Sequence, residues 1–358
     1  MKDSPHTPTL RDIAKAAGVS AMTVSRALRG SPLQNKDTRE RIKRIARELG
    51  WKPNPLVSAL MGQRARRHGA RASANLAILD PRSDEPAANR NHIRGALVRA
   101  EELGYRAEVF PYKPADTSPA RLREILLARG ARGVVLMPLP VGVHEIAFDF
   151  TGLSAATIGY SLLSPALHRV ANDTQSHVIL ALRHYEGRGY RRVGLIMADD
   201  ANRRMLCQYT SAADSYDRFF SEGLRVRQLI LPDEEFTAAD MRKILRWIKD
   251  HRLQGVVSSA ENLHRRLVES GAQIPGDFAY IHLHRDGPQS RLTCMDQLRD
   301  YIGSKAVDLV TAMIHRNETF PVAHPQITLT PSELIEGASV PDLRAPVVQR
   351  GRTAAPVI

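Results

Sequence analysis

The sequence TLRDIAKAAGVSAMTVSRALRGSPLQNKDTRERIKRIARELGWKPN, residues 9–54, contains the signals of a compact three-helix domain. Apolar residues recur at helical spacing directly after Thr9, a favourable N-cap residue, so we expect a first helix over 10–17. Gly18 can take a positive φ and end this helix, and Ser20 can cap the next one. Two helices joined by so tight a turn form a helix-turn-helix.

The second helix, expected over about 21–28, has the composition of a surface that faces a polyanion. Val24 and either Ala27 or Leu28 face inward, and the outward positions include no acidic residue. The outward residues are Ala21, Met22, Thr23, Ser25, Arg26 and Arg29. This profile is typical of a recognition helix that enters the major groove of DNA.

A third helix is predicted over 36–49, with Asn35 as its cap and Gly50 after its end. Its apolar stripe consists of Ile42, Ile45, Ala46 and Leu49. Its outer face is formed by Thr38, Arg39, Arg41, Lys43, Arg44 and Arg47. A basic, solvated surface would explain one such helix alone. The turn, the caps and the third helix together have the spacing that a single trihelical domain requires.

Positive charge is concentrated at one end of the chain. Residues 1–72 carry 16 Lys or Arg against 5 Asp or Glu, a net charge of +11, whereas all 358 residues carry +13. This local basicity implies a polyanionic partner, whose binding weakens as salt is added. RNA or a membrane surface would also accept the charge, but neither explains the turn, and no amphipathic stretch indicates lipid insertion.

Residues 9–54 resemble the N-terminal headpiece of the LacI/GalR (lactose-repressor-like) family of bacterial transcription regulators. The family signatures TLxDIAxxAGVSxxTVSRxL and YxPN appear as TLRDIAKAAGVSAMTVSRAL and WKPN. The resemblance implies base contacts from Ala21, Met22 and Arg26, with Arg26 as the best candidate for a bidentate bond to guanine. It implies phosphate contacts from Thr9, Ser20, Thr23, Ser25, Asn35 and Thr38. Arg29 replaces a small polar residue of the family and is a further candidate for a phosphate or base contact.

The segment NPLVSALMGQRARR (54–67) falls where the family places a hinge helix that forms on the operator. Contacts in the minor groove are implied for Asn54, Val57, Leu60 and Met61, and Leu60 occupies the position of the inserted wedge. Val57-Ser58 departs from the Ala-Arg of the family, so the hinge helices of a dimer are expected to pack differently. A plain interdomain linker is the alternative for 55–74.

From about Asn75, short apolar runs alternate with amphipathic segments. Strands are expected at 75–80, 107–112, 133–138, 155–161, 192–197, 226–232, 255–260 and 278–283. Helices are expected at 90–105, 118–130, 174–189, within 201–223, and at 237–252 and 302–314. Such alternation predicts α/β architecture with parallel sheets flanked by helices, and roughly 270 residues suffice for two lobes. We divide the chain into a headpiece (1–54), a hinge and linker (55–74), a two-lobed core (75–342) and a tail (343–358).

The core resembles, more loosely, the periplasmic-binding-protein-like effector domain of the same family. The segments HRVANDTQSHVILALRHYEGRGYRRVGLI (168–196) and IPGDFAYI (274–281) carry this resemblance. Asp173 falls where family members bind a ligand hydroxyl, a role that suits a polyol. An aspartate that only caps the helix 174–189 is the alternative, and the two roles can coexist.

Other effector positions depart from the family pattern. Its Gly-x-Asp is replaced by YIHLHRDG (280–287), with His284 nearest to the ligand position. The Arg-x-x-Gly-aromatic motif of the family is matched only weakly by NRRMLCQY (202–209). Arg203 and Arg204 are therefore the candidates for an effector contact in this segment. The resemblance implies a carbohydrate effector, but these departures leave its identity open.

The sequence does not indicate an enzyme. The phosphate loop, the G-x-S-x-G elbow and the dinucleotide fingerprint are all missing, and we expect no cofactor. Cys207 and Cys294 lie far apart and are expected to be buried core thiols. His282 and His284 alternate on a strand, but without clustered Cys or carboxylates we expect no metal. The chain has no signal-peptide pattern and no long apolar run, so we expect a cytoplasmic, nucleoid-associated protein without a membrane partner.

The sequence therefore predicts a homodimeric transcription regulator, more a repressor than an activator, that binds a palindromic DNA operator and senses a small molecule. One headpiece reads too few base pairs to be selective, whereas a two-fold pair multiplies specificity. Two alternatives remain open. The core could serve only for dimerisation, or it could be an α/β enzyme fused to a DNA-binding domain.

Overall fold

The computed structural model describes residues 8–20, 23–24, 27, 36–49, 75–85, 87–232, 236–284 and 291–344. The predicted hinge and linker, the cap Asn35, Gly50 and nearly all of the predicted tail lie outside these residues. Within the described part of the chain, no helix is both long and apolar enough to cross a bilayer.

The described part of the N-terminal domain is helical where its caps predict. Helix α1 (Leu10–Ala17) begins at Thr9 and ends at Gly18, which takes a φ of 64°. Helix α3 spans Lys36–Glu48, and residues 23–24 and 27 are helical between α1 and α3. Their shared core is formed by Ile13, Ala14, Ala17, Val24, Ala27, Ile42 and Ala46. Leu49 was expected in this core but is 40% exposed, because α3 ends before it.

The first lobe of the core is built on a parallel six-stranded sheet in the order β11-β5-β4-β3-β1-β2. Its strands are β1 (Asn75–Asp80), β2 (Arg106–Pro111), β3 (Ala131–Leu136), β4 (Ser154–Ile158), β5 (His168–Asn172) and β11 (Ile327–Thr330). Its helices are α5 (Arg90–Glu102), α6 (Pro119–Ala128) and α12 (Arg299–Arg316). Helices α5 and α12 share a core with one face of the sheet, and α6 packs with the other.

The second lobe is built on a six-stranded sheet in the order β12-β10-β9-β8-β6-β7, in which only β12 is antiparallel. Its strands are β6 (Arg192–Ala198), β7 (Arg225–Leu231), β8 (Gly255–Ser258), β9 (Ala279–His282), β10 (Thr293–Asp296) and β12 (Glu333–Ile335). Its helices are α7 (Thr174–Gly187), α8 (Asp199–Arg204), α9 (Gln208–Ser215), α10 (Ala238–Asp250) and α11 (Leu263–Glu269). Helices α7 and α9 cover one face, and α10 and α11 cover the other.

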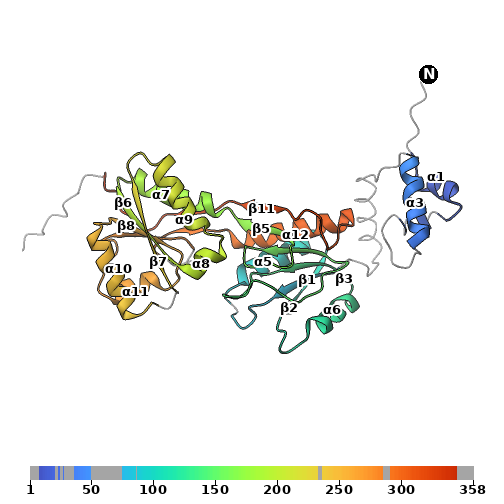
Figure 1. The fold of residues 1–358 in the computed structure, drawn as a ribbon, viewed down its shortest axis with the longest axis horizontal. Coiled ribbons are helices and arrows are strands. Elements are labelled where there is room, and N and C mark those ends of the chain that lie inside the picture. The colour runs from blue at the N-terminus through green and yellow to red at the C-terminus, as the bar shows by residue number, and fades with distance from the viewer. Residues whose placement is uncertain are drawn as a thin grey trace, which may run out of the picture.

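The chain passes between the two lobes three times, from β5 to α7, from β10 to α12 and from β11 to β12 (Figure 1). The two-lobed α/β core with its helical headpiece is the fold that the sequence predicts. The second passage, from β10 to α12, returns the chain to the first lobe, which α12 and β11 then complete from the C-terminal third of the sequence.

The structure corrects three details. The helix expected within 201–223 is divided into α8, α9 and a π-helical turn at Tyr216–Phe220, because Leu206 and Cys207 have positive φ. Cys207 is exposed at this break, so its expected burial is wrong, whereas Cys294 is buried. The strands β5, β10, β11 and β12 and the helix α11 were not predicted.

Candidate DNA-binding headpiece and interlobe site

Thr9 and Asp12 form a reciprocal capping box at the start of α1. The Thr9 amide donates to Asp12 Oδ2 at 2.7 Å, and the Asp12 amide donates to Thr9 Oγ1 at 3.4 Å. This box satisfies the first amides of α1 and fixes the angle at which the chain enters it. A phosphate that Thr9 contacts would therefore lie beside an ordered helix terminus.

Ser20 and Thr23 lie together at the start of the second helix of the helix-turn-helix. The Thr23 amide donates to Ser20 Oγ at 3.1 Å, and the two hydroxyl oxygens are 2.9 Å apart. Val24, the next residue, is fully buried in the headpiece core and holds this end of the helix in place. A helix N-terminus with two hydroxyls suits the phosphate backbone, because its dipole and amides favour an anion.

One basic side chain of α3 forms a hydrogen bond within the headpiece. Arg41 donates from Nη2 to the carbonyl of Ala17 at 3.2 Å and so ties α3 to the last turn of α1. Thr38, a predicted phosphate contact, is half-buried. Sequence reasoning placed Arg41 on the outer face and missed this bond, since its partner is 24 residues away.

The remaining predicted DNA contacts fall outside the described residues. They are Ala21, Met22, Ser25, Arg26, Arg29, Asn35, Asn54, Val57, Leu60 and Met61.

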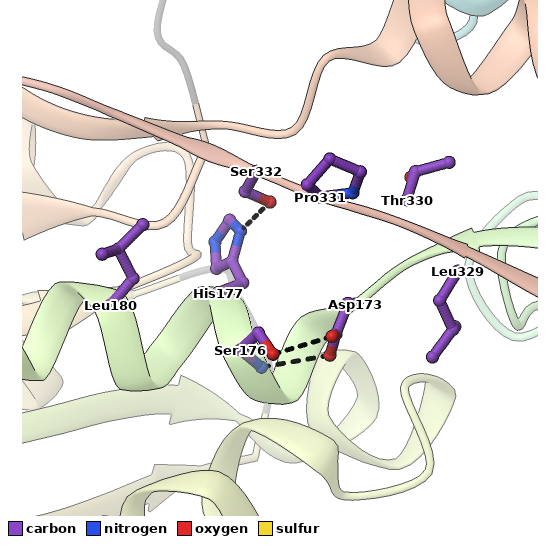
Figure 2. Close-up of a pocket in the computed structure, with 8 residues that line it drawn as sticks. All are labelled: Asp173, Ser176, His177, Leu180, Leu329, Thr330, Pro331 and Ser332. Carbon is purple, nitrogen blue, oxygen red and sulfur yellow. Dashed lines mark hydrogen bonds between the residues drawn. The ribbon is translucent and has the colours of Figure 1, made fainter.

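Asp173 stands at the first passage between the lobes and caps α7. Its Oδ1 accepts the Ser176 amide at 3.1 Å, and its Oδ2 accepts the Ser176 hydroxyl at 2.7 Å (Figure 2). Its own amide donates to the carbonyl of Thr330 on the third passage, at 2.9 Å. A cavity of about 240 Å³ opens beside it, lined by Asp173, Ser176, His177, Leu180, Leu329, Thr330, Pro331 and Ser332. The carboxylate thus caps the helix and borders a cavity at the same time.

His177 links α7 to two other segments and was not singled out by sequence reasoning. Its Nε2 lies 2.8 Å from the carbonyl of Leu283, just after β9, and its Nδ1 lies 2.7 Å from Ser332 Oγ. Asn172 Nδ2 donates to the same hydroxyl at 2.7 Å. Burial lowers the pKa of His177 to about 4. The neutral ring therefore donates from Nε2 to Leu283 and accepts the Ser332 proton at Nδ1.

The two predicted arginines of α8 differ in their surroundings. Arg203 is largely exposed, and its Nε donates to Asp199 Oδ2 at 2.8 Å on the same helix. Arg204 is half-buried and donates from Nη2 to the carbonyl of Leu139, which follows β3 in the first lobe. Arg204 therefore spans the two lobes, and Arg203 does not.

His284 lies at the carboxyl end of β9, where the parallel strands of the second lobe point toward the first. Its amide donates to His282 Nδ1 at 2.9 Å, and its Nε2 is 3.3 Å from the Tyr209 hydroxyl. Burial lowers the pKa of the His284 imidazole well below its ordinary value, and the positive charge of Arg299 adds to this effect. Among the described residues, no group of three or more His, Cys, Asp or Glu is arranged to hold a metal ion.

The headpiece is similar to a known family of proteins. The family described as "Bacterial regulatory proteins, lacI family" matches residues 9–54. The regulator PtxS of Pseudomonas plecoglossicida is 23% identical over 376 residues, which cover 96% of this chain and 95% of PtxS. The match to this family is confined to the headpiece, whereas the similarity to PtxS extends over nearly the whole chain. The matched family is described as regulatory proteins, and PtxS is a transcriptional regulator.

Other similar proteins match a shorter part of the chain. An uncharacterized regulator in the aml 5′ region of Streptomyces limosus is 28% identical over 208 residues. The repressor CytR of Escherichia coli K12 is 26% identical over 207 residues. These two matches cover 55% and 56% of this chain and 54% and 56% of the relatives, so the chain spans about half the length of each.

Solved structures of transcription regulators share the fold over most of the chain. The complex of the regulator CelR with cellobiose has a TM-score of 0.54 at 22% identity and covers 93% of this chain and 99% of that one. The lac repressor dimer bound to operator and the anti-inducer ONPF has a TM-score of 0.53 at 18% identity, covering 94% and 100%. At these identities the likeness concerns the fold.

Proposed function

We propose that this chain is a homodimeric transcription repressor that binds a two-fold symmetric operator and responds to a small ligand between its lobes. The observation that carries the proposal is the helix-turn-helix, in which Thr9, Gly18 and Ser20 fix the start and end of α1 and the start of the next helix. The +11 charge of residues 1–72 supplies the attraction to phosphates. Such a protein acts in the cytoplasm, on the nucleoid.

The proposed division of labour follows the domains. Residues 1–54 read the operator, 55–74 form a hinge, 75–342 dimerise and sense the ligand, and 343–358 are a tail. In the headpiece, Ala21, Met22 and Arg26 read bases. Phosphates are bound by Thr9, Ser20, Thr23, Ser25, Arg29, Asn35 and Thr38. The hinge residues Asn54, Val57, Leu60 and Met61 enter the minor groove.

The ligand site is proposed between the lobes. Arg204 spans the lobes, Asp173 borders a cavity at the first passage, and His284 follows a strand that points toward the other lobe. Structural neighbours support a carbohydrate class, since CelR is solved with cellobiose and a regulator of Alkaliphilus metalliredigens with D-xylulofuranose, the latter at a TM-score of 0.54 and 15% identity. Arg203, paired with Asp199 at the surface, is not retained as a ligand contact.

The proposal is tested by selecting bound sites from random or genomic DNA with the purified full-length protein at a stated salt concentration, with and without a pool of sugars. We expect a two-fold symmetric motif, and sedimentation of the complex should give two chains per site. A sugar that releases the DNA identifies an inducer. Failure to enrich any motif contradicts specific regulation, whereas a motif indifferent to every ligand favours a core that only dimerises.

A further inference from the structure

Three basic side chains lie on segments that come together between the lobes, namely α5, α12 and the end of β9. His92 lies on α5, Arg299 begins α12, and His284 follows β9. The backbones of the two helices touch at this point, because a Cβ on Gly303 would lie 2.0 Å from the carbonyl oxygen of His92. His282 pairs with Cys294, so the chain that leaves β9 runs beside the chain that leads from β10 to Arg299.

The lowered pKa values of His92 and His284 agree with this placement. The pKa of His92 falls to about 3, first because the ring is buried and second because Arg299 is close. The same arginine contributes to the lowered pKa of His284. One guanidinium therefore lies near a histidine of each lobe, and both imidazoles are neutral at physiological pH.

The charge of Arg299 is not balanced by a neighbouring acid. Its Nε bonds only to Gln297 Oε1, at 3.4 Å, and among the described residues no carboxylate lies within ion-pair distance. The acids closest in sequence have other partners. Asp300 pairs with Arg94, and Asp296 accepts the Leu298 amide at 2.9 Å. A half-buried cation without a counter-ion favours an anion from outside.

Two further donor groups point to the same kind of ligand. His92 is 8% exposed, and its Nδ1 is buried without a hydrogen-bond partner. Helix α12 is 18 residues long, and its N-cap residue is Leu298, which has no side-chain oxygen or nitrogen to cap the first amides. An uncapped helix N-terminus presents amide donors and the positive end of the helix dipole.

We propose that the effector carries an anionic group, a carboxylate or a phosphate, and that this group binds to Arg299 at the start of α12. His92 donates to it from Nδ1 on the side of the first lobe, and His284 lies on the side of the second. The anion thus bridges the lobes and favours their closed arrangement. This inference rests on the proposed ligand sensing and names the chemical class of the ligand.

The test uses the purified full-length chain and matched pairs of compounds. Glucose is compared with gluconate and glucose 6-phosphate, and galactose with galacturonate, by thermal unfolding and calorimetry. Inorganic phosphate, against chloride at equal ionic strength, is the minimal probe. We expect the acidic member of a pair to raise the unfolding temperature and the neutral member to leave it unchanged. Carboxylate and phosphate probes separate the two sources of the anion.

Arg299→Gln supplies the decisive variant, and Arg316→Gln is its control at the other end of the same helix. Arg316 pairs with Glu318 at 2.7 Å and is 55% exposed. We expect Arg299→Gln to weaken binding of the acidic compound at least tenfold while its unfolding temperature without ligand stays near that of the unmodified chain. Arg316→Gln should bind normally.

Three results would overturn the inference. Binding of neutral sugars alone would reject the anionic class but keep ligand sensing. Equal losses in Arg299→Gln and Arg316→Gln would remove Arg299 from the site. No response to either class or to phosphate would reject both the anionic class and ligand sensing, while the operator selection would still test DNA binding separately.

Discussion

At the scale of single residues, His177 shows how a buried hydrogen-bonded ring becomes sensitive to acid. Both of its ring nitrogens have partners that suit the neutral tautomer, Leu283 as acceptor and Ser332 as donor. An added proton at Nδ1 would face the Ser332 hydroxyl, which already accepts a hydrogen bond from Asn172. Burial of the ring disfavours its charged form in the folded chain and lowers its pKa to about 4, against 6.5 for an ordinary histidine.

This difference predicts a loss of stability in acid. Because the folded pKa lies below the unfolded one, the unfolded chain binds more protons between pH 6.5 and 4. The contribution of His177 is complete above about pH 6.5 and decreases as the pH falls toward 4, by roughly 3 kcal/mol in all. Urea denaturation at several pH values checks this. His177→Gln should show a shallower decline, whereas replacement of the exposed His324 should leave the slope unchanged. Parallel curves for His177→Gln and the unmodified chain would contradict the prediction.

Arg26 carries a prediction about sequence reading. Arg26→Ala is expected to cost about 1–3 kcal/mol on the operator and to relax base preference at one position, because a bidentate bond to guanine is lost. Thr23→Ala should weaken operator and random DNA alike, since a phosphate contact carries no base information. Fluorescence anisotropy with both DNAs makes the comparison. Equal losses on both for Arg26→Ala would exclude it from base reading.

The roles of some residues could be predicted because their partners are close in sequence. The roles of others could not, because their partners are far away along the chain. Thr9, Gly18 and Ser20 act on neighbours within three or four residues, so their roles follow from the sequence. The partners of Arg204 and His177 lie 65 and 106 residues away, at Leu139 and Leu283. No periodicity encodes such a meeting, because it depends on how the two lobes come together.

At the scale of elements, the crossing of α5 and α12 depends on two glycines. A Cβ on Gly95 would lie 1.9 Å from the carbonyl oxygen of Asp300, and one on Gly303 would lie 2.0 Å from that of His92. The obstacles are backbone atoms of the facing helix, which cannot rotate away. Both helices share a core with the sheet of the first lobe, so their separation affects that core as well.

Gly303→Ala is therefore expected to destabilise the first lobe by about 3 kcal/mol or more, because the helices must separate. Gly187→Ala is the control, since Gly187 lies in helix α7 and a Cβ there meets nothing within 4 Å. That change should stabilise the chain by about 0.5–1 kcal/mol. Thermal and urea unfolding of both variants measure the difference. A tolerated Gly303→Ala would show that the crossing is wider than described.

The elements that the sequence predicts are the long or fully buried ones. Strands such as β1 and β6 are continuous apolar runs, and α10 has a capping box formed by Thr237 and Asp240. The unpredicted β11 and β12 have four and three residues, and both are edge strands of their sheets. An edge strand is held by pairing on one side and carries a weak apolar pattern, so its position depends on the sheet already formed.

At the scale of the whole molecule, the proposed hinge connects the headpiece to the core. Leu60→Ala is expected to reduce operator affinity and operator bending, because the apolar wedge in the minor groove is lost. The unfolding temperature of the core should not change. Gel mobility with permuted operator fragments reports the bend, and anisotropy reports the affinity. Unchanged affinity and bending would mean that 55–74 is only a linker.

The three passages between the lobes also have a consequence for how this chain is made. Helix α12 and strand β11, which complete the first lobe, lie between Arg299 and Thr330, whereas the strand β1 of the same lobe begins at Asn75. During synthesis, the headpiece leaves the ribosome long before this lobe can close. A messenger interrupted before codon 299 would yield a basic headpiece attached to a core without Ile302, Ala306, Val307 and Val310. Such a fragment would present a substrate for quality-control proteases, and only near-complete translation yields a folded core.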